Sequence, residues 1–104
     1  MSKIRLDIPH GLSKDQAKQR VEKLLGHWSR KYGVSTQWSG DEAKLAGKVM
    51  GISLAADLKV HDGKVDGEAT DPGFLFRDKA KKYLTEKFAH YLDPKTPVEK
   101  LGGD

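Results

Sequence analysis

The chain contains no cysteine. This absence excludes disulfide bonds, thiolate metal sites and cysteine nucleophiles, so packing must stabilise the fold. The chain also has no run of about 18 apolar residues, which a membrane-spanning helix requires, and its first residues lack the apolar stretch of a secretory signal. We therefore expect no membrane span and a cytoplasmic protein.

Sequence signatures of catalysis are absent as well. The four histidines are scattered, and none has the spacing that places two metal ligands on one helix face. The glycines do not match a phosphate-binding loop, and no serine has the context of a nucleophile. The sequence thus predicts no catalytic residue, no metal and no cofactor, and it favours a binding protein over an enzyme. We expect His10, in the turn after the first strand, to bond a nearby backbone group.

The length of 104 residues is that of one domain. Residues 1–93 contain the periodic apolar patterns of regular structure. Residues 94–104 have little apolar content and several residues that interrupt regular structure, so they are predicted to form a flexible C-terminal tail.

Near the N-terminus, apolar residues at alternate positions predict a strand over residues 3–9 with one buried face. Pro9 and Gly11 end this strand. Ser13 and Gln16 have the spacing of a capping box, which marks the start of a helix. The helix ends at Gly33, and its apolar stripe predicts one buried face: Ala17, Val21, Leu24, Leu25, Trp28 and Tyr32.

Short alternating runs separated by glycine and aspartate follow the helix, a pattern typical of an antiparallel meander. Asp62-Gly63 is the strongest hairpin turn in this region. Four strands are predicted, at about residues 34–38, 43–49, 52–60 and 65–69.

A second helix is predicted over about residues 72–92, with Asp71 as its cap and Pro72 in its first position. Asp93-Pro94 ends it. Its predicted apolar stripe consists of Phe76, Ala80, Tyr83, Leu84, Phe88, Tyr91 and Leu92.

The expected order is strand, helix, four strands, helix, which predicts an α+β two-layer sandwich. Because each strand is apolar on one face, both helices should pack on the same face of one twisted antiparallel sheet. This β-α-β-β-β-β-α order resembles the TATA-binding-protein-like fold. The oligomeric state is left open, although residues 65–70 could pair with a second copy if they form an exposed edge strand.

Several short motifs stand out together: the Pro9-His10-Gly11-Leu12-Ser13 turn, the first helix, Tyr32, Trp38-Ser39-Gly40-Asp41, Gly47, Gly51 and Gly73-Phe74-Leu75. With these motifs the chain resembles a small bacterial family, the polyhydroxyalkanoic acid system proteins. The resemblance covers about residues 3–92. It implies a link to polyhydroxyalkanoate storage granules or their metabolism, and it supplies no catalytic residues.

The net charge of +4 raises the question of an anionic partner. The outward positions of the strands are almost neutral, whereas the first helix carries a cationic excess. A solvated helix face explains this excess more simply than nucleic-acid binding does. The candidate anion-binding residues are Lys14, Lys18, Arg20, Lys23, Arg30 and Lys31.

Phe74, Leu75 and Phe76 follow one another at the predicted start of the second helix. Successive helical residues point about 100° apart, so the three side chains cannot all face one core equally. Either a wedged turn buries all three, or some are exposed and bind a partner such as a granule protein or the granule surface.

A ligand cavity under the second helix is a further hypothesis. Small residues on the buried strand face either leave room for a ligand or let the helix pack closely. The predicted lining residues are Trp38, Leu54, Leu58, Phe88 and Tyr91. The overall prediction is a non-catalytic accessory protein of polyhydroxyalkanoate granules or metabolism. An anion-binding module and a carrier or enzyme with an apolar pocket are the alternatives.

Overall fold

Seven elements make up the computed structural model, which describes residues 3–49 and 51–97. Their order is the predicted one: strand, helix, four strands, helix. In chain order they are β1 (Lys3–Pro9), α1 (Lys14–Tyr32), β2 (Ser35–Ser39), β3 (Glu42–Val49), β4 (Ile52–His61), β5 (Lys64–Thr70) and α2 (Arg77–Tyr91).

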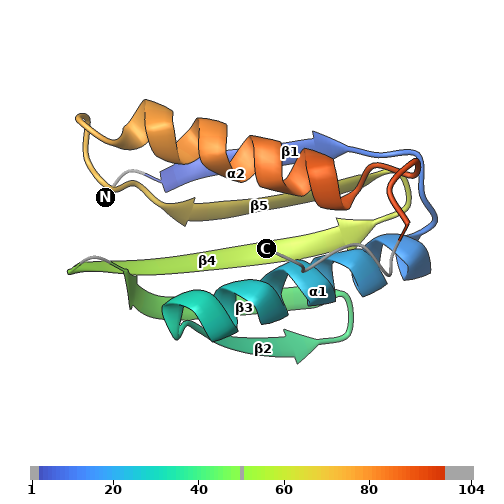
Figure 1. Cartoon of the computed structure of the whole chain (residues 1–104), viewed down its shortest axis with the longest axis horizontal. Coiled ribbons are helices and arrows are strands. Elements are labelled where there is room, and N and C mark those ends of the chain that lie inside the picture. Colours follow the sequence, from blue (N-terminus) through green and yellow to red (C-terminus); the bar gives the residue numbers. More distant parts are fainter. Residues whose placement is uncertain (1–2, 50, 98–104) are drawn as a thin grey trace.

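The five strands form one antiparallel sheet in the order β1-β5-β4-β3-β2 (Figure 1). The last four strands are a simple meander. The first strand joins the far side of that meander, where Lys3 pairs with Thr70 and Pro9 with Lys64. Residues 65–70 therefore lie inside the sheet, and the expectation that they could form an exposed edge is wrong. The edges are β1 and β2.

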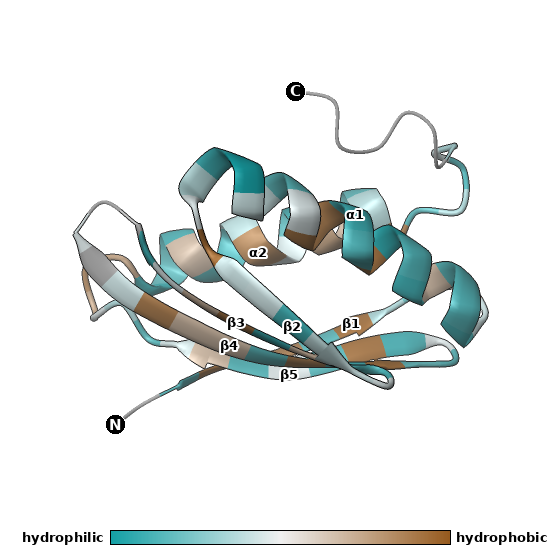
Figure 2. Ribbon diagram, turned by 90° about the horizontal axis from the view of Figure 1, so that it is seen from below, coloured by the Kyte–Doolittle hydropathy of each residue, from teal (hydrophilic) through white to brown (hydrophobic). Residues whose placement is uncertain are grey.

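Both helices cover the same face of the sheet (Figure 2). Helix α2 packs against β1, and α1 packs against β2, β3 and β4. The strands alternate as predicted, with apolar side chains under the helices and charged side chains on the open face. This arrangement confirms the α+β two-layer sandwich.

The ends of α1 have the predicted caps. The Ser13 hydroxyl accepts the Gln16 backbone N–H at 3.3 Å, and the Gln16 side chain accepts the Ser13 N–H at 3.3 Å. At the other end Gly33 adopts the left-handed conformation, with φ of 72°, and donates its N–H to Ser29. Local sequence thus defines this helix at both ends.

The turn that precedes α1 is bonded to the β4–β5 hairpin. The His10 N–H donates to the Gly63 carbonyl at 2.8 Å, and the Gly63 N–H donates to the Leu12 carbonyl at 3.3 Å. The Asp62 carboxylate accepts the Lys14 N–H at 2.7 Å. An acidic group thus lies at the positive end of the α1 dipole, where it is stabilising.

Helix α2 begins at Arg77, and the predicted start at residue 72 is wrong. Gly73 has a φ of 105°, which lies outside the helical region. Asp71 caps a turn instead of the helix, because its carboxylate accepts the Gly73 N–H at 2.9 Å and pairs with the Arg77 guanidinium at 2.6 Å. Residues 74–76 consequently lie in a turn ahead of the helix.

A hydrogen-bonded turn follows α2. The Asp93 carboxylate accepts the Lys95 N–H at 2.9 Å, and the Asp93 carbonyl accepts the Thr96 N–H at 3.0 Å. The remainder of the predicted tail, residues 98–104, lies outside the described residues. The domain boundary at residue 93 stays a prediction.

Gly67 provides a test of the sheet packing. A Cβ atom at this position would collide with the Asp57 carbonyl oxygen and approach the Leu58 side chain to 2.9 Å. We expect Gly67→Ala to lower the free energy of unfolding by about 2–3 kcal/mol, measured by urea denaturation. Gly11→Ala is the matched control, because a Cβ there meets nothing within 4 Å, and it should change stability by less than about 1 kcal/mol. Equal stabilities of the two variants would contradict this account of Gly67.

Candidate binding surface and apolar cavity

The turn before α2 exposes three large apolar side chains. Phe74 is 79% exposed, Leu75 72% and Phe76 52%. The alternative in which a wedged turn buries all three is therefore wrong. The three residues follow Gly73, whose φ of 105° lies outside the helical region, and they precede the helix, which begins at Arg77.

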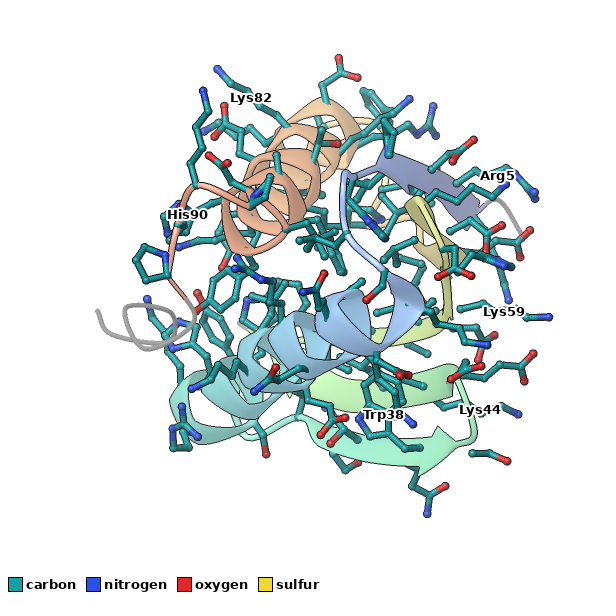
Figure 3. All side chains as sticks on the ribbon, turned by 90° about the vertical axis from the view of Figure 1, so that its right-hand side faces the viewer. Arg5, Trp38, Lys44, Lys59, Lys82 and His90 are labelled. Carbon is teal, nitrogen blue, oxygen red and sulfur yellow. The ribbon has the colours of Figure 1, made fainter. Side chains whose placement is uncertain are left out.

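Cationic side chains lie close to this apolar turn. Helix α2 carries five basic and two acidic residues. Arg77 is paired with Asp71, whereas Lys79, Lys81 and Lys82 are exposed. Figure 3 shows Lys82 on the outer side of α2, away from the sheet. The turn and the first half of α2 therefore form a surface that is both apolar and positively charged.

The cations of α1 are dispersed, in contrast to this surface. The Lys14 ammonium lies 3.1 Å from the Asp41 carboxylate, and the hydrogen bond to Asp41 raises the pKa of Lys14. Lys18 lies over the Trp38 ring, 5.4 Å from its centroid. Lys31 lies over the Tyr32 ring.

Arg20 is buried, so its predicted role in anion binding is wrong. Its guanidinium donates to the carbonyls of Tyr91 at 3.2 Å and Asp93 at 2.8 Å. It thus satisfies carbonyl groups at the C-terminus of α2, where a positive charge also complements the helix dipole. The sequence alone indicated that Arg20 is buried, because Arg20 is three residues after Ala17 and four before Leu24 in the buried stripe. For Lys23 and Arg30, a role in anion binding stays a prediction.

The open face of the sheet is covered by charges of both signs. Arg5 pairs with Glu68 at 3.3 Å, and Lys59 with Glu42 at 3.9 Å. Figure 3 shows Arg5, Lys44 and Lys59 along this face. The mixture of charges fits the expectation that the sheet is not a phosphate-binding platform.

An apolar cavity of about 350 Å³ lies between the two helices and the sheet, partly open to solvent. Leu54 and Ala56 of β4 line its floor. Trp28 of α1 and Tyr83 and Leu84 of α2 line its walls. A cavity is therefore present under α2, as the small strand residues allowed.

Most of the predicted lining residues lie elsewhere. Of the five, only Leu54 lines the cavity. Leu58, Phe88 and Tyr91 are almost fully buried in the core. Trp38 packs with Lys18 at the side of α1. The predicted set is wrong, because it combined Leu54, which lines the cavity, with residues of the closely packed core.

Trp28 lines the cavity and also belongs to the core. Its indole N–H donates to the Tyr83 hydroxyl at 3.1 Å, and its ring stacks against that of Tyr83. The Phe88 ring also meets the Trp28 ring edge-on, with 5.8 Å between centroids. One side chain of α1 thus holds α2 through both a hydrogen bond and ring contacts.

No group of three or more acidic or histidine side chains in residues 3–49 and 51–97 is arranged to hold a metal ion. Neither described helix is both long and apolar enough to span a bilayer.

The family model described as "Putative polyhydroxyalkanoic acid system protein" matches residues 4–95. The chain belongs to this family. No curated protein and no solved structure matched the chain. The match confirms the resemblance carried by the sequence motifs, and it includes the exposed turn, both helices and all five strands.

The structure gives the first of those family motifs a structural role. Within the Pro9–Ser13 turn, the His10 Nδ1 atom accepts the Leu12 N–H at 3.1 Å, so the expectation that His10 bonds a nearby backbone group is confirmed. The same turn holds the β4–β5 hairpin through its backbone.

Arg20→Met tests the link between α1 and the end of α2. Methionine keeps the apolar stem but removes both hydrogen bonds to the Tyr91 and Asp93 carbonyls. We expect the free energy of unfolding to fall by about 1.5–3 kcal/mol, measured by chemical denaturation. Arg30→Met, at an exposed position of the same helix, should change it by less than about 0.5 kcal/mol. Equal effects of the two substitutions would contradict the capping role of Arg20.

Proposed function

We propose that this protein is a non-catalytic accessory protein that binds the surface of polyhydroxyalkanoate granules in the cytoplasm. The contact is made by the Phe74–Leu75–Phe76 turn. The observation that carries the proposal is the exposure of three consecutive large apolar side chains in a member of a polyhydroxyalkanoic acid system family. Exposed apolar patches of this kind mark interaction sites in soluble proteins.

The energetics fit a reversible attachment to an extended apolar surface. Burying one large apolar side chain contributes about 1.5–3 kcal/mol, so three such side chains supply roughly 4–9 kcal/mol. Loss of translational and rotational freedom on association costs at least about 4 kcal/mol. The turn alone therefore gives weak binding, and an additional attraction is needed for stable attachment.

The lysines of α2 can supply that attraction. Lys79 is three residues after Phe76. Lys82, the last of the three lysines, lies about 9 Å from Phe76 along the helix axis. A surface with negative charge would attract them while the apolar turn inserts, as in other interfacial segments that combine apolar and basic residues. The ionic strength should then affect attachment, because salt screens exposed charges.

The alternative of nucleic-acid binding through α1 has no comparable support. Arg20 is buried and bonded to backbone carbonyls, and Lys14 is paired with Asp41. Trp38 lies under Lys18 and Tyr32 lies under Lys31, and both rings are half-buried, whereas single-strand binding needs exposed rings on which bases can stack.

Cosedimentation with purified polyhydroxyalkanoate granules tests the proposal. The unmodified protein should sediment with the granules, and Phe74→Ser and Leu75→Ser should each weaken binding by about tenfold, the equivalent of one apolar contact. Ala89→Ser, at an exposed position farther along α2, is the matched control and should bind normally.

Circular dichroism and thermal melting must show that the variants remain folded, which we expect because both side chains are exposed. Replacing Lys79 and Lys82 with glutamine should remove most of the salt dependence of binding. If the folded serine variants sediment as well as the unmodified protein, the turn is not the granule-binding site.

A further inference from the structure

We propose that the cavity between α1, α2 and the sheet is a binding site for a single aliphatic chain of about ten carbons. The ligand class is an unbranched aliphatic chain whose polar head group stays at the solvent opening, and alkanoic acids of graded length are its probes. This inference goes beyond granule attachment, because it concerns a different surface and different residues.

The first argument is the difference between the two ends of the helix–sheet layer. At one end, Leu58 and Val60 of β4 belong to the same core as Phe88 and Tyr91 of α2, and all four are almost fully buried. Two residues earlier on the same strand, the inward position is Ala56, and two turns earlier on α2 it is Ala80. These alanines line the cavity. The sequence therefore fills the space beneath α2 at one end and leaves it empty at the other.

The second argument is that the side chains lining the cavity cannot easily move to fill it. Trp28 is held in place by its hydrogen bond to Tyr83 and by its contact with Phe88, so its ring is not free to swing inward. Gly47 contributes only backbone to the lining, because a Cβ atom there would come within 2.7 Å of the Val34 side chain. A rigid apolar space of this kind is suited to a ligand.

The third argument concerns the chemistry of the occupant. The lining is almost entirely hydrocarbon, and the indole N–H of Trp28 already donates to the Tyr83 hydroxyl. A polar group placed deep in the cavity would lose its water without a good replacement partner. The buried part of the ligand must therefore be apolar, and any charged group must remain at the opening.

The volume sets the length of that apolar part. A cavity of about 350 Å³ equals the share of roughly a dozen molecules in liquid water, at about 30 Å³ each. A methylene group needs slightly less room than a water molecule, and packing in the site is imperfect, so about ten carbons fit. This volume is at the lower end of small-molecule sites.

The test is a titration of the full chain with hexanoic, octanoic, decanoic and tetradecanoic acids. Because Trp28 lines the cavity, its fluorescence reports binding, and Trp38→Phe removes the second tryptophan signal. We expect affinity to rise by about three- to fourfold with each methylene up to about ten carbons and to level off beyond that length. Decanol should bind with similar affinity, because the head group lies outside.

Substitutions that fill the cavity provide the specific control. Ala80→Leu and Ala56→Leu each place a larger side chain in the cavity and should weaken decanoic acid binding by at least tenfold. Their thermal midpoints should be unchanged or higher, because the added side chains fill empty space. Ala89→Leu, on the exposed side of α2, should bind decanoic acid like the unmodified protein.

Three results would overturn the proposal: no binding of decanoic acid at millimolar concentration, equal affinity in folded Ala80→Leu, or a dimer that Ala80→Leu dissociates. The last would show that a second copy occupies the cavity. The Phe74 and Leu75 variants should keep their affinity for decanoic acid, so the failure of this proposal can be distinguished from the failure of granule binding.

Discussion

The packing of Trp28 between α1 and α2 determines how the helical layer of this protein is arranged. The indole ring reaches from α1 to α2, donates to the Tyr83 hydroxyl and meets the Phe88 ring edge-on. On the Phe88 side the helix–sheet layer is filled, and on the Tyr83 side it encloses a cavity. Arg20 adds a second link at the end of α2. Helix α2 is thus attached firmly through its C-terminal half.

The N-terminal half of α2 differs in composition and exposure. There the helix presents Lys79, Lys81 and Lys82 to solvent, and the turn before it exposes residues 74–76. The cavity lies beneath the same half of the helix. Both proposed binding properties are therefore located at the N-terminal half of α2, whereas Phe88 and Tyr91 in its C-terminal half belong to the core. A division of this kind lets surface residues change without loss of the fold.

The sequence was sufficient wherever structure depends on neighbouring residues. Alternation defined the five strands, Ser13 and Gln16 defined the start of α1, and its end followed from Gly33. The fold class followed from the one-sided strands. The start of α2 was missed because the turn at Gly73 resembles a helix cap in local sequence. The role of Arg20 and the lining of the cavity were missed because both depend on how α2 lies across the sheet, and that placement rests on contacts between residues distant in the chain.

The pairing of β1 with β5 has a consequence for how the protein folds. Lys3 lies opposite Thr70. Strand β1 is synthesised first, but it cannot pair within the sheet until β5, the last strand, has been synthesised. The meander from β2 to β5 consists of local hairpins, which form quickly, whereas closing the long loop between Pro9 and Lys64 costs chain entropy before any contact compensates for it. Until β1 pairs with it, β5 is an unpaired edge strand that can pair with other chains. Docking of β1 is thus the event that completes the sheet and covers β5, and it leaves β1 as the edge strand in place of β5.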